Sequence, residues 1–398
     1  MRVCLVSQEY PPETGWGGIG TYTRHLAHGL AQAGHRVEVI SRTPEGEAPG
    51  CRGDGPVRVR RVAPMPIPVR GRRFVGRSTA SLEFARAVDH ALRRIDRPDV
   101  IEVPNWNAEG LWHLARRGRV APVAVRVHSP YAAVAASRGE RLTMDKRLAM
   151  TLERAAVRRA DLVVTHSVYN ARVAADLYGL DLASIPIVPH GIPLPVEDPE
   201  PGRRQGNRLL YVGRLERRKG IQAMVEALPA VLDANPEVRV VLAGQDFPTA
   251  PGGVTWREHA ECLLSPAQQA RVRFAGHVED SELERLYREN DLFVAPSLYE
   301  SFGLVYLEAM SRGLPVIGCR VAAIPEVVAH GETGLLVPPG DAPALAQAIT
   351  SLLRDEGARA EMGARGRDTV KRLFTVEAMA SRVADLYTRL AERKRALR

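Results

Sequence analysis

The chain has 398 residues, of which 45% are hydrophobic and 25% charged, an ordinary composition for a globular protein long enough for two or three domains. Lysine and arginine outnumber aspartate and glutamate by 55 to 46, giving a net charge of +9 that favours anionic partners. No apolar run approaches the roughly 20 residues that cross a bilayer, and the first residues enter a strand pattern without a signal-like segment. We therefore expect a cytoplasmic protein.

The first half of the chain alternates strand and helix patterns. The expected strands are residues 2–7, 35–40, 100–103, 123–127 and 162–165, and the expected helices are 22–33, 78–95 and 141–160. Strands separated by helices predict a parallel sheet with right-handed crossovers. Arginines crowd residues 52–77, and another basic cluster closes the chain at 389–398. We interpret both as solvated surface. Peripheral contact with a membrane is the second reading, and no motif supports nucleic-acid binding.

Residues 190–202 contain four prolines and two glycines, which predicts a linker at about 191–206. A second alternating series follows. Its expected strands are 209–212, 238–243, 272–274, 292–294, 316–317 and 335–337, with helices after residue 341. The fold class predicted is α/β, with two doubly wound Rossmann-like domains at 1–190 and 207–374 and a final helical segment at 375–398. Ligands of such domains bind at the carboxyl ends of the strands.

Two carboxylates, Glu300 and Glu308, stand eight residues apart across a predicted strand-to-helix junction. The strand before them ends at Pro296, and the helical spacing begins near Ser301. Free backbone N–H groups at the start of a helix form an anion-binding site. A glycine there lets a ligand approach the backbone closely. The residues expected to supply this site are Ser301, Phe302, Gly303 and Leu304. The two glutamates could then meet hydroxyls at two separate points of one ligand.

This segment resembles the Glu-x7-Glu signature of the retaining glycosyltransferases of family 4, which have the GT-B fold. The matching surroundings are 211–220, 318–326 and 331–337. The alternative is two surface glutamates beside an ordinary turn. The resemblance implies two Rossmann-like domains facing a cleft, with 375–398 crossing back to the first. It also implies that Glu300 contacts the transferred sugar and Glu308 the ribose of the nucleotide.

Arg214 and Lys219 follow the first strand of the second half, where fixed cations would stabilise a leaving diphosphate. The resemblance assigns this pair to the donor diphosphate. The alternative is a solvated basic turn, and we expect the intervening Arg217 and Arg218 to be exposed. The loop His277-Val278-Glu279-Asp280 is where the family holds the nucleotide base. Asp280 could instead cap the helix expected from Ser281.

Residues 15–20 match the dinucleotide fingerprint Gly-x-Gly-x-x-Gly, with Glu38 as a possible ribose ligand. The loop after Ser7 is too long for the tight turn of that motif, so a dehydrogenase is disfavoured. In family 4 a glycine loop at this place, here Gly17 and Gly18, approaches the donor phosphates and the acceptor.

His128 follows the strand 123–127, and the resemblance gives it a catalytic role near the reacting sugar; the alternative is a structural hydrogen-bonder. His190 is expected to position backbone at the linker. The segment 99–107 differs from the histidine-bearing segment that the family usually has in its acceptor domain. The identity of the acceptor therefore cannot be inferred from the family. The residues expected to contact the acceptor are Glu9, Tyr10, Asn105, Trp106 and Tyr131. Residues 320–323 lack the glycine pair that the family usually has before Ile-Pro-Glu. The sequence therefore does not determine the backbone conformation at this point.

We expect a retaining glycosyltransferase that moves a sugar from a nucleotide-diphospho-sugar of UDP or GDP type to a small polar or natural-product acceptor. The linkage formed would be α. No Asp-x-Asp pair and no Cys-x-x-Cys pair occurs, so neither a metal nor a cofactor is expected. The alternative is a nucleotide-sugar epimerase of the same fold. The sequence does not identify the sugar, the base or the acceptor.

Overall fold

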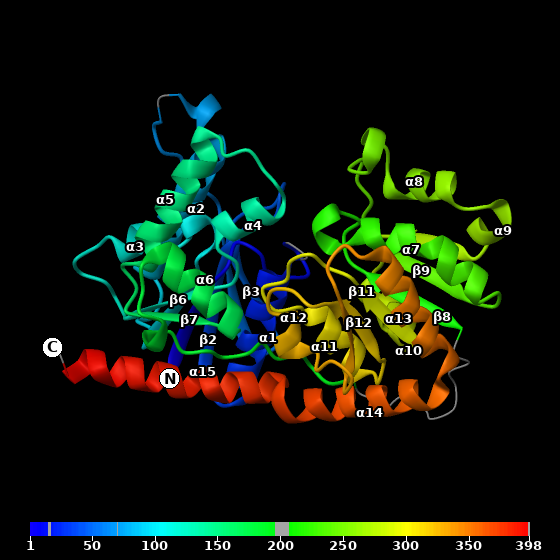
Figure 1. Ribbon diagram of the computed structural model, residues 1–398. Coiled ribbons are helices and arrows are strands. Elements are labelled where there is room, and N and C mark those ends of the chain that lie inside the picture. Colours follow the sequence, from blue (N-terminus) through cyan, green and yellow to red (C-terminus); the bar gives the residue numbers. More distant parts are fainter. Residues whose placement is uncertain (15–16, 70, 196–206, 397–398) are drawn as a thin grey trace. The chain divides into compact units, whose positions relative to one another are not determined.

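The computed structural model describes residues 1–14, 17–69, 71–195 and 207–396 (Figure 1). The chain forms two compact units, Met1–Pro193 with Thr375–Arg398, and Leu194–Phe374. Most of the linker expected at 191–206 lies outside the described residues, as do the first two residues of the glycine fingerprint. In the part of the chain that is described, no helix is both long and apolar enough to span a membrane.

The first unit is built on a seven-stranded sheet in the order β3-β4-β2-β1-β5-β6-β7. The strands are β1 (Arg2–Val6), β2 (Arg36–Arg42), β3 (Gly50–Asp54), β4 (Val57–Val62), β5 (Val100–Pro104), β6 (Val123–Val127) and β7 (Leu162–Thr165). All neighbours are parallel except the edge pair β3 and β4. Val3 and Leu5 enter one hydrophobic core, whereas Cys4 and Val6 enter another. Burial on both faces explains why residues 3–6 of β1 are all apolar.

The helices of the first unit are α1 (Gly18–Gln32), α2 (Gly76–Leu92), α3 (Leu111–Leu114), α4 (Tyr131–Ser137), α5 (Met144–Val157), α6 (Val168–Tyr178) and α15 (Val376–Ala396), with short 3-10 turns η1 (Arg72–Phe74), η2 (Trp106–Ala108) and η3 (Leu182–Ser184). Helix α15 lies against α1 at Gly29, where a Cβ would come within 2.6 Å of Val376 Cγ1. Its Met379, Val383 and Tyr387, spaced by four residues, belong to the core that contains Leu26 of α1.

One expectation for the basic segments is wrong in part. Part of the arginine-rich stretch forms β3 and β4 rather than a loop, and Arg61 on β4 is 3% exposed. The basic tail, described up to residue 396, is helical and mostly exposed, and Lys394 and Arg395 of α15 pair with Asp161 and Asp99 at 2.7 and 2.6 Å. Alternation of valine and arginine is typical of a strand with one buried face, so β4 could have been predicted from its sequence.

The second unit has a six-stranded, wholly parallel sheet in the order β10-β9-β8-β11-β12-β13. The strands are β8 (Arg208–Val212), β9 (Arg239–Ala243), β10 (Val272–Gly276), β11 (Leu292–Ala295), β12 (Val316–Cys319) and β13 (Gly334–Val337). The helices are α7 (Ile221–Ala234), α8 (Trp256–Leu263), α9 (Pro266–Gln269), α10 (Asp280–Glu289), α11 (Leu304–Ser311), α12 (Ile324–Val327), α13 (Ala342–Arg354) and α14 (Glu356–Leu373), with turns η4 (Arg217–Lys219) and η5 (Pro251–Gly253).

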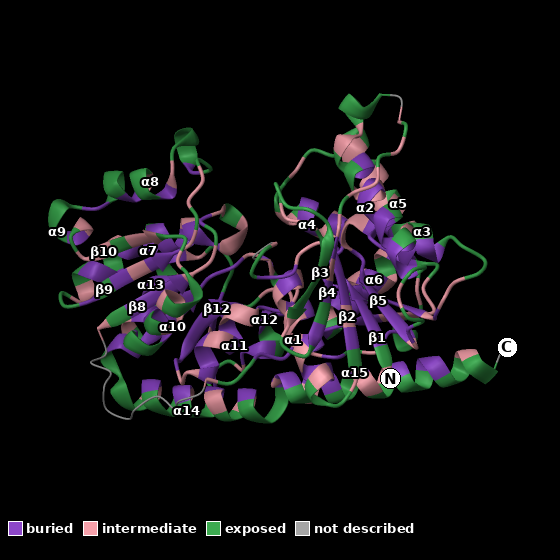
Figure 2. Cartoon of the chain, turned by 180° about the vertical axis from the view of Figure 1, so that it is seen from behind, coloured by how far each residue is buried: buried purple, intermediate pink, exposed green. Residues whose placement is uncertain are grey.

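Each sheet reverses its strand order once. In the first unit β1 lies between β2 and β5, and in the second β8 lies between β9 and β11. The central strands of both sheets are buried, as Figure 2 shows in purple. In open parallel sheets the ligand crevice lies outside the carboxyl ends of the two strands at this reversal. The loops after β1 and β5, and those after β8 and β11, are therefore the places where function is expected.

Candidate functional site

In the second unit the loops after β8 and β11 are tied to each other. The Tyr211 hydroxyl donates to the carbonyls of Arg214 and Lys219, at 3.2 and 3.3 Å. Gly220 has a φ of +73°, and a Cβ there would lie 1.8 Å from the Pro296 carbonyl oxygen. Only glycine allows this approach, which brings Lys219 to the end of β11.

Glu300 is the centre of this arrangement. The residue is 8% exposed, and Lys219 Nζ lies 2.5 Å from Glu300 Oε1. The Ser297 hydroxyl donates to the same oxygen at 3.1 Å. Burial by itself raises the pKa of Glu300, but the charges of Lys219 and Arg218 outweigh it and hold the pKa below its usual value. The carboxylate is therefore ionised and fixed in one orientation.

Sequence reasoning assigned Lys219 and Glu300 to different parts of a donor, and the structure brings them into direct contact. It also corrects the role of the arginines around Lys219. The Arg218 side chain is 12% exposed and donates to the Tyr299 carbonyl at 3.3 Å, whereas that of Arg214 is 50% exposed. Both arginines pair with Glu216, at 2.9 and 3.1 Å. Arg218 is thus part of the scaffold rather than solvated, because its backbone and side chain both bind the 298–299 segment.

The helix after Glu300 starts later than expected. Gly303, with a φ of +102°, is the N-cap, and α11 begins at Leu304. The first free helical N–H groups therefore lie from Leu304 onward rather than at Ser301 and Phe302. The Phe302 ring is buried against Phe374, with ring centroids 5.9 Å apart. Phe302 could therefore contact a nucleotide-sugar donor only through its backbone.

Glu308 lies two turns into α11 and accepts from the Tyr287 hydroxyl at 2.9 Å. Burial raises the pKa of Glu308 above its usual value, and Asp280 adds to the rise, while the Tyr287 hydrogen bond opposes it. Asp280 is therefore close enough to Glu308 to influence its charge, although 28 residues separate them in the chain. Such a pair of carboxylates suits binding to hydroxyl donors such as those of a ribose.

The structure excludes one of the two roles expected for Asp280, which follows β10: that of a helix cap. Asp280 is the first residue of α10, and Glu279 occupies the N-cap position without a side-chain hydrogen bond to the helix. Asp280 does not cap the helix expected at Ser281, which actually begins one residue earlier. His277 and Asp280 are exposed and Val278 is half-buried. The three residues predicted to hold a nucleotide base remain accessible to one.

The departure from the family pattern at 320–323 has a clear structure. Ala322 adopts a φ of +51°, the left-handed conformation that a glycine normally supplies. The turn directs the Ala323 N–H to the Glu300 carbonyl oxygen at 3.2 Å. Ala322 thus adopts the left-handed turn without a glycine, and the turn supports the main chain at Glu300.

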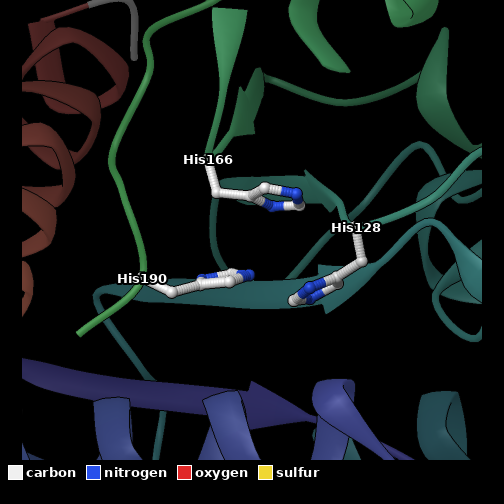
Figure 3. Close-up of side chains that lie close together, drawn as sticks. All are labelled: His128, His166 and His190. Atoms are coloured by element: carbon white, nitrogen blue, oxygen red, sulfur yellow. The ribbon is translucent and has the colours of Figure 1, made fainter. Parts of the chain in front are cut away.

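In the first unit, His128 at the end of β6 is 5% exposed and meets His166 and His190 (Figure 3). The ring centroids of His128 and His190 are 5.6 Å apart, and those of His166 and His190 are 4.3 Å apart. Burial, with the charges of His166 and Arg126, lowers the pKa of His128 well below its usual value. Sequence reasoning placed His190 at a linker, whereas it belongs to this buried cluster.

The candidate ligand nitrogens of the three histidines all lie within 4.8 Å of one another, which raises the possibility of a metal site. The surroundings do not fit a cation. The buried Arg126 already acts as a positive charge on His128 and His190, and this charge would repel a cation bound between them. We therefore describe His128 and His190 as neutral imidazoles, with their rings stacked on each other and the ring of His166 tilted against both.

The residues expected to contact an acceptor have different environments. Asn105 is fully buried, donates to the Ser129 carbonyl at 3.1 Å and accepts from the His128 N–H at 2.8 Å. Tyr10 is 1% exposed. Because both are buried, they are placed to shape the loops rather than to touch a ligand.

Trp106 and Tyr131 form a second group with an arginine that sequence reasoning missed. The Arg77 guanidinium lies over both rings, 5.2 Å from the Trp106 centroid and 4.5 Å from that of Tyr131. Arg77 is exposed, so its charge is available to a ligand. Glu9 lies elsewhere, beside Gly17, where a Cβ would be 2.4 Å from Glu9 Oε2. Gly18, the first residue of α1, has open space around it.

Comparison with known proteins identifies the class of protein to which this site belongs. Residues 16–195 match the family described as Glycosyltransferase Family 4, and residues 197–369 match Glycosyl transferases group 1. A D-inositol 3-phosphate glycosyltransferase of Kineococcus radiotolerans is 32% identical, with 88% of this chain and 85% of the relative aligned. A glycogen synthase of Mycobacterium tuberculosis is 29% identical over 97% of this chain and 94% of its own length.

Among solved structures, a sucrose-phosphate synthase of Thermosynechococcus elongatus is similar with a TM-score of 0.81 and 28% identity, covering 98% of both chains. The fold and these matches define a glycosyltransferase with the GT-B fold. In particular, the chain belongs to glycosyltransferase family 4.

Proposed function

We propose that this glycosyltransferase is a retaining enzyme that moves a sugar from a UDP- or GDP-sugar to a small polar acceptor, forming an α-linkage without a metal or cofactor. The observation that carries the proposal is the ionised Glu300 carboxylate, held by Lys219 and Ser297 at the strand-order reversal, with Glu308 further along the same segment. A small acceptor is favoured by the similarity to D-inositol 3-phosphate glycosyltransferases.

In this mechanism Lys219 and Arg214 bind the donor diphosphate. Negative charge grows on the diphosphate as the sugar leaves, and fixed cations stabilise that charge more in the transition state than in the ground state. Lys219 already has its ammonium beside Glu300, so it can neutralise both the phosphate and the carboxylate. Glu308 accepts hydrogen bonds from the ribose hydroxyls. The backbone N–H groups of Ser301, Gly303 and Leu304 bind the phosphates.

Glu300 orients the sugar through its hydroxyls, and its charge stabilises an oxocarbenium-like centre. Its ion pair with Lys219 makes it a poor nucleophile, which favours front-face attack, with the leaving diphosphate taking the acceptor proton. His128 contributes as a neutral imidazole, with one N–H donor and one acceptor nitrogen, because protonation of the buried ring is costly.

The experiment is a donor screen by thermal shift with UDP-glucose, GDP-mannose and ADP-glucose, since a bound ligand raises apparent stability by mass action. The donor identified is then incubated with D-myo-inositol 3-phosphate or with glycogen, and the anomeric configuration of the product is read by NMR. Addition of EDTA, which chelates divalent metal ions, tests whether turnover needs a metal. A β-linked product would refute the proposal that the enzyme retains the configuration of the donor. Loss of turnover on chelation would refute the proposal that it works without a metal.

Glycogen is included because the relative from M. tuberculosis is a glycogen synthase. Transfer to glycogen but not to the inositol phosphate would replace the small acceptor by a polysaccharide. The comparisons give no support to an epimerase, and none of the relatives named above is one. Incubation of the donor alone checks this, because an epimerised donor would be its product.

A further inference from the structure

Arg61 is a buried arginine on β4, the strand next to the edge strand β3. Its side chain is 2% exposed, although the residues before it on the strand, Arg58 and Arg60, are exposed or half-buried. The strand period of two turns Arg60 to the opposite face, where it pairs with Glu38 at 2.7 Å. A fully buried guanidinium is costly unless its donors are satisfied, so the partners of Arg61 show what it is for.

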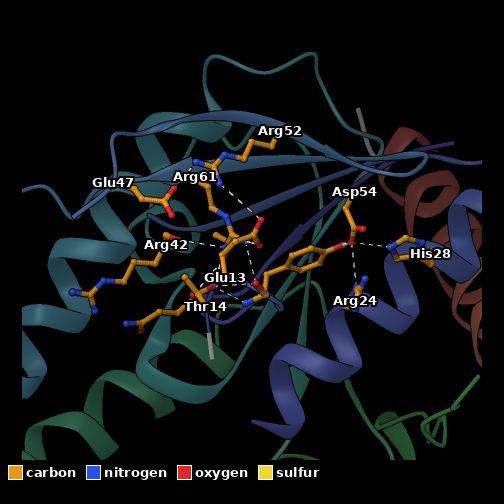
Figure 4. Close-up of polar contacts among 12 residues, drawn as sticks. Glu13, Thr14, Arg24, His28, Arg42, Glu47, Arg52, Asp54 and Arg61 are labelled. Atoms are coloured by element: carbon orange, nitrogen blue, oxygen red, sulfur yellow. Dashed lines mark hydrogen bonds and ion pairs between the residues drawn. The ribbon is translucent and has the colours of Figure 1, made fainter. Parts of the chain in front are cut away.

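Most of these partners lie on the loop that follows β1 (Figure 4). Arg61 Nη2 donates to the Tyr10 carbonyl oxygen at 3.0 Å and to Glu13 Oε2 at 2.5 Å. Arg61 Nη1 donates to Thr14 Oγ1 at 2.8 Å and to Ser41 Oγ, at the end of β2, at 2.9 Å. One guanidinium thus binds three residues of the loop and joins them to the sheet.

A second anchor holds the same loop from the neighbouring strand β3. The Tyr10 hydroxyl donates to Asp54 Oδ2 at 2.9 Å, and His28 Nε2 and Arg24 Nε of α1 lie 2.8 and 3.3 Å from the same oxygen. Burial raises the pKa of Asp54, but its hydrogen bonds to His28 and Tyr10 outweigh this effect and lower the pKa below its usual value. The loop is therefore fastened both to the sheet edge and to α1.

The loop fixed in this way positions Glu9. The Ser7 hydroxyl donates to the Glu9 carbonyl oxygen at 2.6 Å, and the next carbonyl along the chain is the one that Arg61 holds. The Glu9 carboxylate fills the space that Gly17 leaves free, since a Cβ on residue 17 would be 2.4 Å from Glu9 Oε2. The placement of Glu9 beside the glycine loop thus depends on the backbone at Tyr10.

We propose that Arg61 is a positioning residue for sugar transfer: it fixes the loop after β1 so that Glu9 and the glycine loop are held ready for the acceptor. This inference rests on the proposed function and on the expectation from the sequence that Glu9 contacts the acceptor. The dependence is mutual, because a displaced loop would leave the buried guanidinium without its acceptors. A lysine could keep the charge, but it lacks the planar fork that binds several oxygens at once.

Three variants test the role. Arg61→Met removes the charge and the fork, Arg61→Lys restores the charge alone, and Arg60→Met is the matched control, which removes an ion pair from the other face of the same strand. Steady-state kinetics are measured with the donor found by the thermal-shift screen and with D-myo-inositol 3-phosphate or glycogen as acceptor. Hydrogen–deuterium exchange is followed on the peptide covering residues 8–14.

For Arg61→Met we expect the acceptor KM to rise about tenfold or more, because a displaced binding group loses its alignment, while the donor KM changes by less than about twofold. Exchange in 8–14 should become faster. Arg61→Lys should recover part of both effects, and Arg60→Met should show neither.

Parent-like kinetics and exchange in Arg61→Met would overturn the inference. So would equal losses for donor and acceptor that merely follow the fraction of folded protein, since they would mean that Arg61 serves stability alone. A parent protein that transfers no sugar from any donor would count against the proposed function instead. The exchange measurement would still decide whether Arg61 holds the loop: unchanged exchange would overturn the inference in that case as well.

Discussion

Replacing Ala322 by glycine should stabilise the second unit. Ala322 has a φ of +51°, a conformation that costs a residue with a Cβ about 1–2 kcal/mol. Glycine removes that cost but gives the unfolded chain more freedom, which is worth about 0.4–1 kcal/mol in the opposite direction. The mean values of the two terms leave a net gain of about 0.8 kcal/mol, or about 2–3 °C in the midpoint of thermal unfolding for a unit of this size.

The neighbouring residue provides the control. Ala323 is fully buried with a φ of −88°, so glycine there relieves nothing, loses a buried methyl group and should destabilise by about 1 kcal/mol. Both variants and the parent are compared by differential scanning calorimetry at one scan rate. Our reasoning fails if Ala322→Gly unfolds at or below the parent temperature, or if the two variants shift in the same direction.

The remaining predictions concern the proposed chemistry and the buried histidines. Lys219→Ala should lower kcat/KM by about 100-fold or more, through loss of charge stabilisation in the transition state, in assays with saturating acceptor. Glu300→Gln should lower kcat strongly with nucleotide affinity nearly intact, whereas Glu308→Ala should weaken nucleotide binding in calorimetric titrations. Burial and neighbouring charges lower the pKa of His128 and His190 well below 6.5, so the unfolded chain binds more protons than the folded one below about pH 6.5. Their contribution to the unfolding free energy should therefore fall on acidification, by up to about 1.4 kcal/mol per pH unit for each ring.

Each of these predictions has its own check. Arg217→Ala is the control for Lys219, because Arg217 is an exposed neighbour in the same turn. A glycosyl adduct trapped on Glu300 would contradict front-face attack, and a Glu300→Gln variant with parent kcat would remove Glu300 from the reaction. For the histidines, urea unfolding of the parent and of His190→Asn is compared at several values between about pH 7 and pH 5. Equal pH slopes would mean that His190 contributes nothing to acid sensitivity, whatever the buried carboxylates do.

The amino-acid sequence by itself determined the α/β class, the alternation of strands and helices, and the two glutamates at a strand-to-helix junction. These features are local: burial on both faces makes parallel strands continuous apolar runs, and helices repeat their apolar positions every three or four residues. Local pattern also limited what could be predicted. The start of α11 at Leu304 was missed because Gly303 takes a left-handed cap that spacing alone does not reveal.

Only the tertiary structure decided which side chains meet. Lys219 and Glu300 are 81 residues apart in the chain, and their contact depends on Gly220 lying against Pro296. The histidine cluster joins the ends of β6 and β7 to residue 190, and Arg61 holds a loop about 50 residues before it. Arg218 and Arg61 appear in the sequence as two more arginines in basic stretches, and burial distinguishes them. A side chain's partners depend on how the strands are ordered in the sheet, and that order arises from packing of the whole unit rather than from any one segment.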